Sequence, residues 1–160
     1  MISTRRLRLE PASATTAAQL AYGGDGGWTW LGGGPEEGTR GMAGMVSRAA
    51  EVGWHRPPWG LYVIVHPADG LAVGSVGFHG PPDTSGEVEI GYDLVPLARG
   101  FGLATEATRA LTRYAFTHPA VRGVLALTRP DNTASQRVLL RAGFHRGTDV
   151  DGLRRYRVDR

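Results

Sequence analysis

Residues 87–107 read EVEIGYDLVPLARGFGLATEA, and this stretch decides the fold. Its first part, Glu87–Val95, alternates between apolar and polar positions, which predicts a β-strand that Pro96 ends. Its second part runs through Arg99-Gly100-Phe101-Gly102 into apolar residues at helical spacing, which predicts a helix over about 102–116. Two glycines at the entry to a helix leave backbone N–H groups free to point at an anion, and the helix dipole adds to the attraction. The alternative is a glycine-rich turn that binds no ligand.

Periodicity and turn residues predict the elements on either side of this stretch. Strands are expected over 4–10 (an edge strand), 59–66, 71–79 and 123–128, and helices over 13–20 and about 36–52. A last helix should start at Asp131 or Asn132, with Ala134, Val138 and Ala142 on its inner face, and end at a left-handed Gly143 followed by Phe144. A terminal hairpin is expected around Asp151-Gly152.

The glycine-rich segment from Gly23 to Gly44 allows two interpretations. It holds ten glycines together with Trp28 and Trp30. It is either a poorly structured surface segment or a mobile wall over a substrate site, with Trp and Met side chains as adaptable apolar contacts.

Composition excludes several classes of chemistry. The chain has 160 residues, which is the length of one domain. It has no Cys, so disulfides, thiolate zinc sites, Fe–S clusters and cysteine nucleophiles are excluded. All 18 basic residues are Arg, which excludes a Schiff-base lysine and a P-loop lysine. No metal site, signal peptide or membrane span is expected, and a cytoplasmic location is the default expectation.

Three stretches together resemble the GNAT acyltransferase superfamily, in the branch that includes the ribosomal-protein N-terminal acetyltransferases. They are Glu87–Pro96, Arg99–Ala107 and Asp131–Phe144, and Arg99–Ala104 matches the family's Arg/Gln-x-x-Gly-x-Gly/Ala loop. The resemblance implies an α+β fold over residues 1–160. It consists of a mixed, mostly antiparallel twisted sheet flanked by helices, with a splayed central strand pair.

The resemblance also implies acetyl-CoA as the acyl-donor cosubstrate. Its pyrophosphate would rest on the backbone amides of the glycine loop, and its pantetheine arm would lie along the end of the 87–95 strand and contact Asn132. The implied binding residues are Leu94, Val95, Arg99, Gly100, Phe101, Gly102, Leu103, Ala104, Thr105 and Asn132. Arg137 and Arg141 either form a solvated helix face or reach an adenosine phosphate.

The implied chemistry is attack by an amine on a thioester, which needs a base for the amine and an acid for the sulfur. Glu89, in the family's Glu-Ile-Gly-Tyr motif, is the first candidate base, and Glu87 is the alternative. A solvent-facing or Arg-paired Glu89 with no catalytic role is also open. Many relatives place a Tyr late in the second helix as the acid. Here Leu139 and Leu140 stand there, so Ser135 is the substitute candidate unless it only caps the helix.

The expected function is therefore acetyl-CoA-dependent N-acetylation of a primary amine, on a protein N-terminus or a small molecule. A catalytically silent acyl-CoA-binding regulatory module is the alternative. Nucleic acid and membranes are not expected partners, because the Arg residues are scattered along the chain. A homodimer is left open, and the sequence does not identify the acceptor. His79 either lines the acceptor site or is an ordinary surface histidine.

Overall fold

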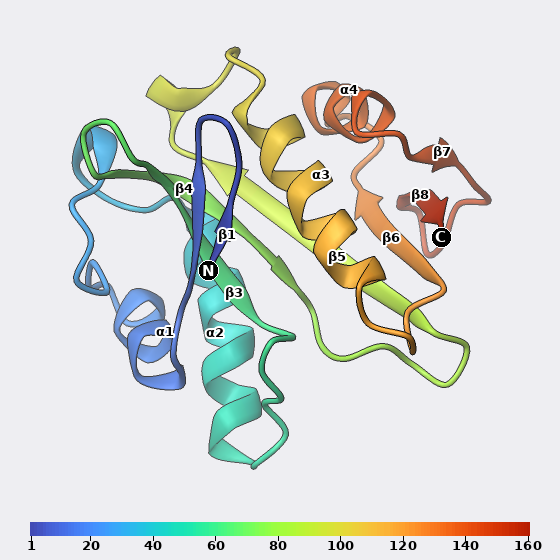
Figure 1. The fold of residues 1–160 in the computed structure, drawn as a ribbon, viewed down its shortest axis with the longest axis horizontal. Helices are drawn as coiled ribbons and strands as arrows, with labels where there is room; N and C mark the ends of the chain where they lie inside the picture. The colour runs from blue at the N-terminus through green and yellow to red at the C-terminus, as the bar shows by residue number, and fades with distance from the viewer.

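The computed structural model describes residues 1–160, which form an eight-stranded sheet with helices on both faces (Figure 1). The strands are β1 (Ile2–Ser3), β2 (Arg8–Pro11), β3 (Leu61–His66), β4 (Leu71–Phe78), β5 (Glu87–Leu94), β6 (Gly123–Thr128), β7 (His145–Arg146) and β8 (Arg154–Asp159). The helices are α1 (Ala14–Ala21), α2 (Glu37–Glu51), α3 (Leu103–Phe116) and α4 (Thr133–Arg141), with short 3-10 turns η1 (Leu31–Gly33) and η2 (Pro96–Ala98). No helix is long and apolar enough to cross a membrane.

The sheet is mixed and mostly antiparallel, as expected. Its strand order is β1-β2-β3-β4-β5-β6-β8-β7, and only the β5–β6 pair is parallel. These two strands pair at their first residues alone, with Glu87 opposite Gly123 and Glu89 opposite Leu125. Beyond this point they have no common ladder, so the predicted splayed central pair is confirmed. Their divergence opens the sheet at the carboxyl end of β5.

The two faces of β5 meet different helices, because successive side chains of a strand point to opposite faces. The Asp93 carboxylate accepts a hydrogen bond from the backbone N–H of Thr39 in α2 at 3.0 Å. On the other face, the Tyr92 hydroxyl donates to the Ser135 carbonyl oxygen in α4 at 2.9 Å. Helix α3 lies over β5 in Figure 1 and contacts it. The core fills the space between helices and sheet, with Ile90 and Leu111 among its fully buried side chains.

Two sequence predictions need correction. Residues 4–10 are not one edge strand, because the chain turns at Arg5-Arg6 and β1 pairs back onto β2. The outer strand is thus β1, while β2 pairs with β3 on its other side. The predicted inner face of the last helix is only partly right, because Val138 and Ala142 pack against the core while Ala134 does not. Gln136 and Leu139 are the buried residues of α4, whereas Ala134 is exposed and Val138 is only half-buried.

The remaining elements are close to their predicted bounds. Ser13 caps α1 by accepting a hydrogen bond from the Thr16 N–H at 3.1 Å. Gly143 follows α4 with a φ of 97°, the left-handed conformation expected there. The glycine-rich segment ends in a full helix, α2, whose buried face includes Met42, Ala43 and Val46. Packing of this face therefore outweighs the poor helix propensity of its glycines.

Candidate functional site

The loop between β5 and α3 has the geometry of an anion site. Gly100 and Gly102 have φ values of 86° and 76°, which side chains with a Cβ rarely adopt. Gly102 is the N-cap of α3 and provides no side-chain cap, so the first N–H groups of the helix lack the usual side-chain partner. Arg99 holds the loop against the strand, because its Nε donates to the Leu94 carbonyl at 3.0 Å. The helix start is therefore open to an anion.

This loop forms one wall of a cleft of about 490 Å³, called the cofactor cleft below. Its other walls are the end of β5 and the first turns of α4, so it lies where β5 and β6 diverge. The residues that line it are Tyr92, Asp93, Leu94, Arg99, Gly100, Gly102, Leu103, Ala104, Thr105, Asn132, Ala134, Ser135, Arg137, Val138 and Arg141. Most of the residues predicted for the cofactor are thus brought together, but Val95, Phe101 and Glu89 do not line this cleft.

The two strand residues predicted to bond the pantetheine differ in position. The Val95 N–H already donates to the Val73 carbonyl oxygen of β4 at 3.0 Å, so it is not available to a ligand. Backbone groups of successive strand residues point to opposite edges. Those of Leu94 therefore face the gap left by β6, where its carbonyl oxygen already accepts from Arg99 Nε. Of the pair, only Leu94 is placed to bond a ligand in the cleft.

Asn132 and Ser135 take part in the start of α4. The Asn132 Oδ1 accepts a hydrogen bond from the Ser135 N–H at 3.0 Å, which is an N-cap. The capping oxygen leaves the Asn132 amide NH₂ free to donate into the cleft. The Ser135 Oγ lies 2.6 Å from the Tyr92 hydroxyl oxygen. Burial raises the pKa of Tyr92 to about 12, although the Ser135 hydrogen bond lowers it, so this phenol stays protonated.

Tyr92 is a site residue to which the sequence analysis assigned no role in the chemistry. Because its one proton goes to the Ser135 carbonyl, the Ser135 hydroxyl can donate to the Tyr92 oxygen. The two hydroxyls therefore form a pair at the wall of the cofactor cleft. Only the meeting of β5 with α4 creates this pair, since the residues lie 43 positions apart.

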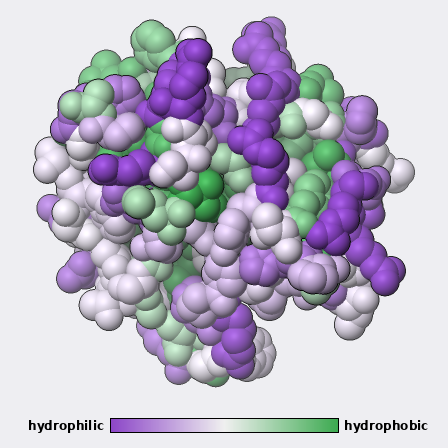
Figure 2. Space-filling view, in the orientation of Figure 1, coloured by the Kyte–Doolittle hydropathy of each residue, from purple (hydrophilic) through white to green (hydrophobic).

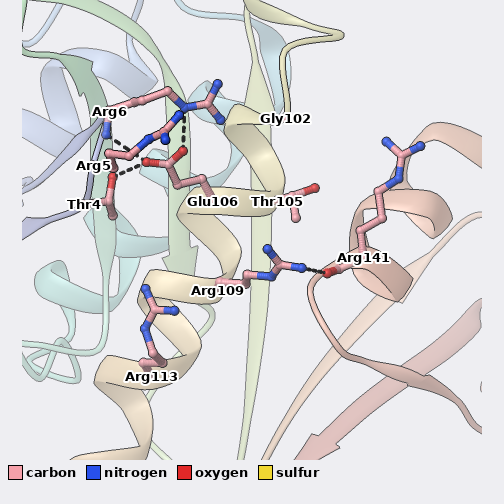
Figure 3. A pocket seen from close by; sticks show the side chains of 9 residues that line it. All are labelled: Thr4, Arg5, Arg6, Gly102, Thr105, Glu106, Arg109, Arg113 and Arg141. Carbon is pink, nitrogen blue, oxygen red and sulfur yellow. Dashed lines mark hydrogen bonds and ion pairs between the residues drawn. The ribbon is translucent and has the colours of Figure 1, made fainter.

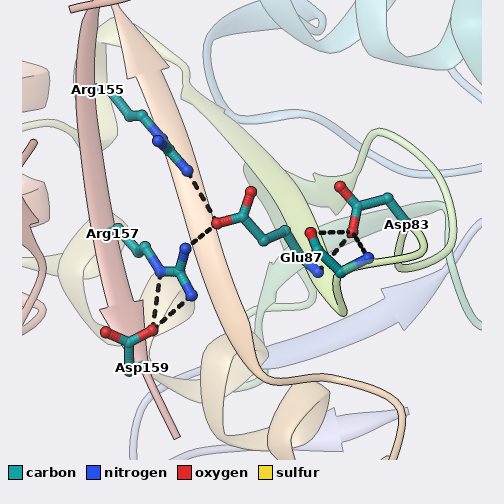
Figure 4. Close-up of polar contacts among 6 residues, drawn as sticks. Asp83, Glu87, Arg155, Arg157 and Asp159 are labelled. Carbon is teal, nitrogen blue, oxygen red and sulfur yellow. Dashed lines mark hydrogen bonds and ion pairs between the residues drawn. The ribbon is translucent and has the colours of Figure 1, made fainter. Parts of the chain in front are cut away.

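The two candidate bases, Glu89 and Glu87, have different partners. Glu89 Oε1 lies 3.1 Å from Nδ1 of His79, and both side chains are about one-third exposed. Glu87 instead receives hydrogen bonds from Arg155, at 2.8 Å, and from Arg157, both on β8 (Figure 4). Two arginines occupy the Glu87 carboxylate, so it is not free to contact an incoming amine. Glu89 is the carboxylate with room for that role.

His79 faces Gly91 on β5. A Cβ added at Gly91 would lie 2.9 Å from His79 Nε2 and 3.1 Å from Met42 Cε. The absence of a side chain at Gly91 therefore makes room for the histidine ring and the Met42 side chain. This contact joins β4, β5 and α2 on the face opposite to the cofactor cleft's α4 wall. No group of His, Cys, Asp and Glu side chains here could hold a metal ion.

Asp93 is the second site residue that the sequence did not single out. Burial raises the pKa of its carboxyl, against the opposing effects of the Thr39 N–H and Arg99. A Cβ at Gly38 would lie only 2.5 Å from Asp93 Oδ2, so the glycine permits the close approach of α2. The adjacent Thr39 hydroxyl is 2.8 Å from the Ser75 hydroxyl. Asp93 thus ties the first turn of α2 to the edge of the cofactor cleft.

Comparison with known proteins identifies the family. The acetyltransferase (GNAT) domain model matches residues 6–145, which include the loop, the splayed strands and α4. The chain belongs to the GNAT acetyltransferase family. The curated relative YjdG of Bacillus subtilis, an uncharacterized N-acetyltransferase, is 34% identical over 83 residues, or 52% of this chain and 49% of that protein. The chain spans less than half the length of three curated relatives that it matches.

Solved structures share the fold of this GNAT chain over nearly its whole length. An acetyltransferase from Agrobacterium tumefaciens has a TM-score of 0.67 at 23% identity, covering 99% of this chain and 94% of the other. RimL, a ribosomal L7/L12 alpha-N-protein acetyltransferase solved with coenzyme A, also has a TM-score of 0.67, at 18% identity, covering 98% and 95%. At these identities the likeness concerns the fold alone.

Proposed function

We propose that this chain is an acetyl-CoA-dependent N-acetyltransferase that acetylates a primary amine. The observation that carries the proposal is the uncapped start of α3, behind two left-handed glycines, at the mouth of a cleft between diverging strands. This arrangement suits a pyrophosphate with an extended arm, because N–H groups bind the charge and the strand edge binds the arm. We also propose that residues 1–160 act as one such domain.

In this proposal each side of the cofactor cleft binds one part of acetyl-CoA. The backbone of Arg99–Thr105 binds the pyrophosphate, and the Arg99 side chain keeps that loop in place. The Leu94 backbone and the free amide NH₂ of Asn132 bond the pantetheine arm. Two apolar side chains of α4, the exposed Ala134 and the half-buried Val138, contact its methylene groups. Contact with the arm would cover apolar surface of α4 that the core leaves open.

The reaction needs one proton acceptor and one proton donor. Glu89, oriented by His79, removes the proton from the incoming ammonium group. The amine nitrogen then forms a bond to the thioester carbonyl carbon, and the carbon–sulfur bond breaks. The thiolate that leaves takes a proton from the Ser135–Tyr92 hydroxyl pair or from water. The acceptor, a protein N-terminus or a small-molecule amine, would approach from the side of His79, Gly91 and Met42.

Two measurements on the same protein test the proposal. Acetyl-CoA at about 100 times its Kd should stabilise the fold by about 2.7 kcal/mol, seen as a higher melting temperature. Release of free thiol should then be followed with a panel of peptide N-termini and small amines. Absence of a thermal shift at saturating acetyl-CoA would contradict the proposal. A thermal shift without thiol release on any amine would identify the silent acyl-CoA-binding module instead.

A further inference from the structure

A second cleft, beside the cofactor cleft, is lined almost entirely by charged and polar side chains. It lies between the β1–β2 turn, α3 and α4 and measures about 500 Å³ (Figure 3). Its lining residues, none of them hydrophobic, are Thr4, Arg5, Arg6, Gly102, Thr105, Glu106, Arg109, Arg113 and Arg141. We call it the arginine cleft. In Figure 2, hydrophilic side chains gather at this face, over the β1–β2 turn and beside α3 and α4.

The arginine cleft accounts for the whole positive charge of the chain. It contains five of the 18 basic residues and one of the 15 acidic residues. The rest of the molecule therefore has one more acidic than basic residue, against a net charge of +3 for the whole chain. Arginines that are scattered in sequence thus converge in space. A cleft lined by one sign of charge attracts and concentrates ligands of the opposite sign.

Two of the five arginines are fixed by contacts within the protein. Arg6 Nε lies 2.7 Å from Glu106 Oε2, and its Nη1 donates to the Phe101 carbonyl at 2.9 Å. Arg109 donates to the carbonyl oxygen of Arg141, which links α3 to α4 (Figure 3). The single carboxylate of the cleft, Glu106, is occupied by Arg6 and by the Thr4 hydroxyl at 2.6 Å. The walls are therefore built before any ligand arrives.

The other three guanidinium groups have no partner. The side chains of Arg5, Arg113 and Arg141 make no hydrogen bond and no ion pair, and all three are exposed. They come from the β1–β2 turn, α3 and α4, so the charges surround the opening from three sides. Like charges in one cleft repel each other, and a bound dianion would offset that repulsion. The fork of N–H donors on an arginine matches phosphate geometry.

The lining also limits what the ligand can be. With no hydrophobic residue in its walls, the cleft suits a charged group and not an acyl chain. The cleft shares Gly102, Thr105 and Arg141 with the cofactor cleft, so a ligand can extend from one into the other. We propose that the arginine cleft binds a phosphomonoester dianion, supplied by the 3′-phosphate of the CoA whose pyrophosphate rests on the neighbouring loop. The choice of this source rests on the proposed function.

The test is a comparison of two ligands by calorimetry. CoA should bind about 10- to 100-fold more tightly than 3′-dephospho-CoA, as expected for charge-assisted hydrogen bonds to one phosphate group. The double variant Arg5→Gln with Arg113→Gln should remove most of that difference while leaving the affinity for 3′-dephospho-CoA unchanged. Arg122→Gln is the matched control, since Arg122 is an exposed arginine outside both clefts. It should change neither affinity.

The possible outcomes separate this inference from the proposed function. Equal binding of CoA and 3′-dephospho-CoA would overturn the assignment of the 3′-phosphate and leave the acetyltransferase proposal intact. Failure of both ligands to bind would contradict the proposed function itself. Inorganic phosphate provides a third arm, because it should weaken the binding of CoA more than that of 3′-dephospho-CoA. Stabilisation of the parent fold by inorganic phosphate that persists in the double variant would overturn the arginine cleft as the phosphate site.

Discussion

The cofactor cleft and the opposite face of β5 are built from different parts of the chain. Around the cofactor cleft, the binding groups are mostly backbone atoms, held by left-handed glycines and by the N-cap Asn132. On the opposite face, side chains bind groups of separate elements, as Glu89 does with His79 and Asp93 does with the Thr39 N–H. One side therefore depends on local conformation, and the other depends on which elements pack together. Variants at four positions test this contrast.

The largest effect is expected on the side-chain face. Glu89→Gln keeps the size of the residue but removes the proton acceptor, so turnover should fall by roughly 10²–10⁴-fold with little change in acetyl-CoA affinity. The matched control is Glu87→Gln, two residues earlier on the same face. It should reduce stability, because Arg155 and Arg157 lose their anionic partner, and leave turnover close to the parent value. Steady-state kinetics with near-parental turnover in Glu89→Gln would contradict the assignment.

The next largest effect is expected in the backbone-built cleft. Gly102→Val forces a β-branched residue into a left-handed conformation and changes the N–H groups that face the pyrophosphate. Acetyl-CoA affinity should fall by about 10- to 100-fold, the loss of one or two charge-assisted hydrogen bonds. Gly70→Val, at a φ of 73° in the β3–β4 turn, has a similar backbone strain away from the cleft. If both variants lose affinity equally in calorimetry, the effect is strain and not ligand contact.

Asn132 allows a sharper test of this contrast, because its side chain both caps the start of α4 and is proposed to bond the ligand. Asn132→Ala should cost about 1 kcal/mol of stability through the lost N-cap and should also raise the KM for acetyl-CoA. Asn132→Asp keeps an oxygen that can accept from the Ser135 N–H but lacks the amide donor. It should retain the stability and still raise the KM. An unchanged KM in both variants would show that Asn132 serves the helix alone.

The smallest effect is expected at Glu106, which joins the β1–β2 turn to α3. Partial burial raises the pKa of its carboxyl, but the hydrogen bonds from Thr4 and Arg6 outweigh burial and hold it below the usual range. Because the pKa is lower in the folded state, the ionised carboxylate stabilises the fold at pH values above the ordinary glutamate pKa. This stabilisation is lost as the pH falls through the lowered folded-state pKa. Glu106→Gln should therefore cost about 1 kcal/mol at neutral pH.

Chemical denaturation at several pH values checks this result. The difference between the parent and Glu106→Gln should shrink as the pH falls from the ordinary glutamate pKa through the lowered folded-state pKa, because below the lower of the two the carboxyl is protonated in both states. Glu37→Gln is the control, since Glu37 is exposed and makes no ion pair. A difference that stays constant with pH would show that the Glu106 contacts act by packing alone.

The sequence by itself determined the elements and the backbone part of the site. The loop glycines, the Asn132 cap and Gly143 each need a particular local conformation, and a residue's own chemistry shows such a need. The alternation of apolar and polar residues located β5, and the helical spacing of apolar residues located α3. Each pattern reflects which face of a single element is buried. These signals operate over a few residues, so they can be read without knowing what packs against the element.

Only the tertiary structure decided which side chains meet. Spacing does not show that Glu87 faces two arginines 68 and 70 positions away, or that Tyr92 joins Ser135. Spacing also assigned Ala134 to the core, because an apolar position that lines a ligand cleft has the same period as one that packs on a sheet. The arginine cleft was hidden for the same reason. Its five arginines come from the β1–β2 turn, α3 and α4, and only packing of those elements brings their charges to one opening.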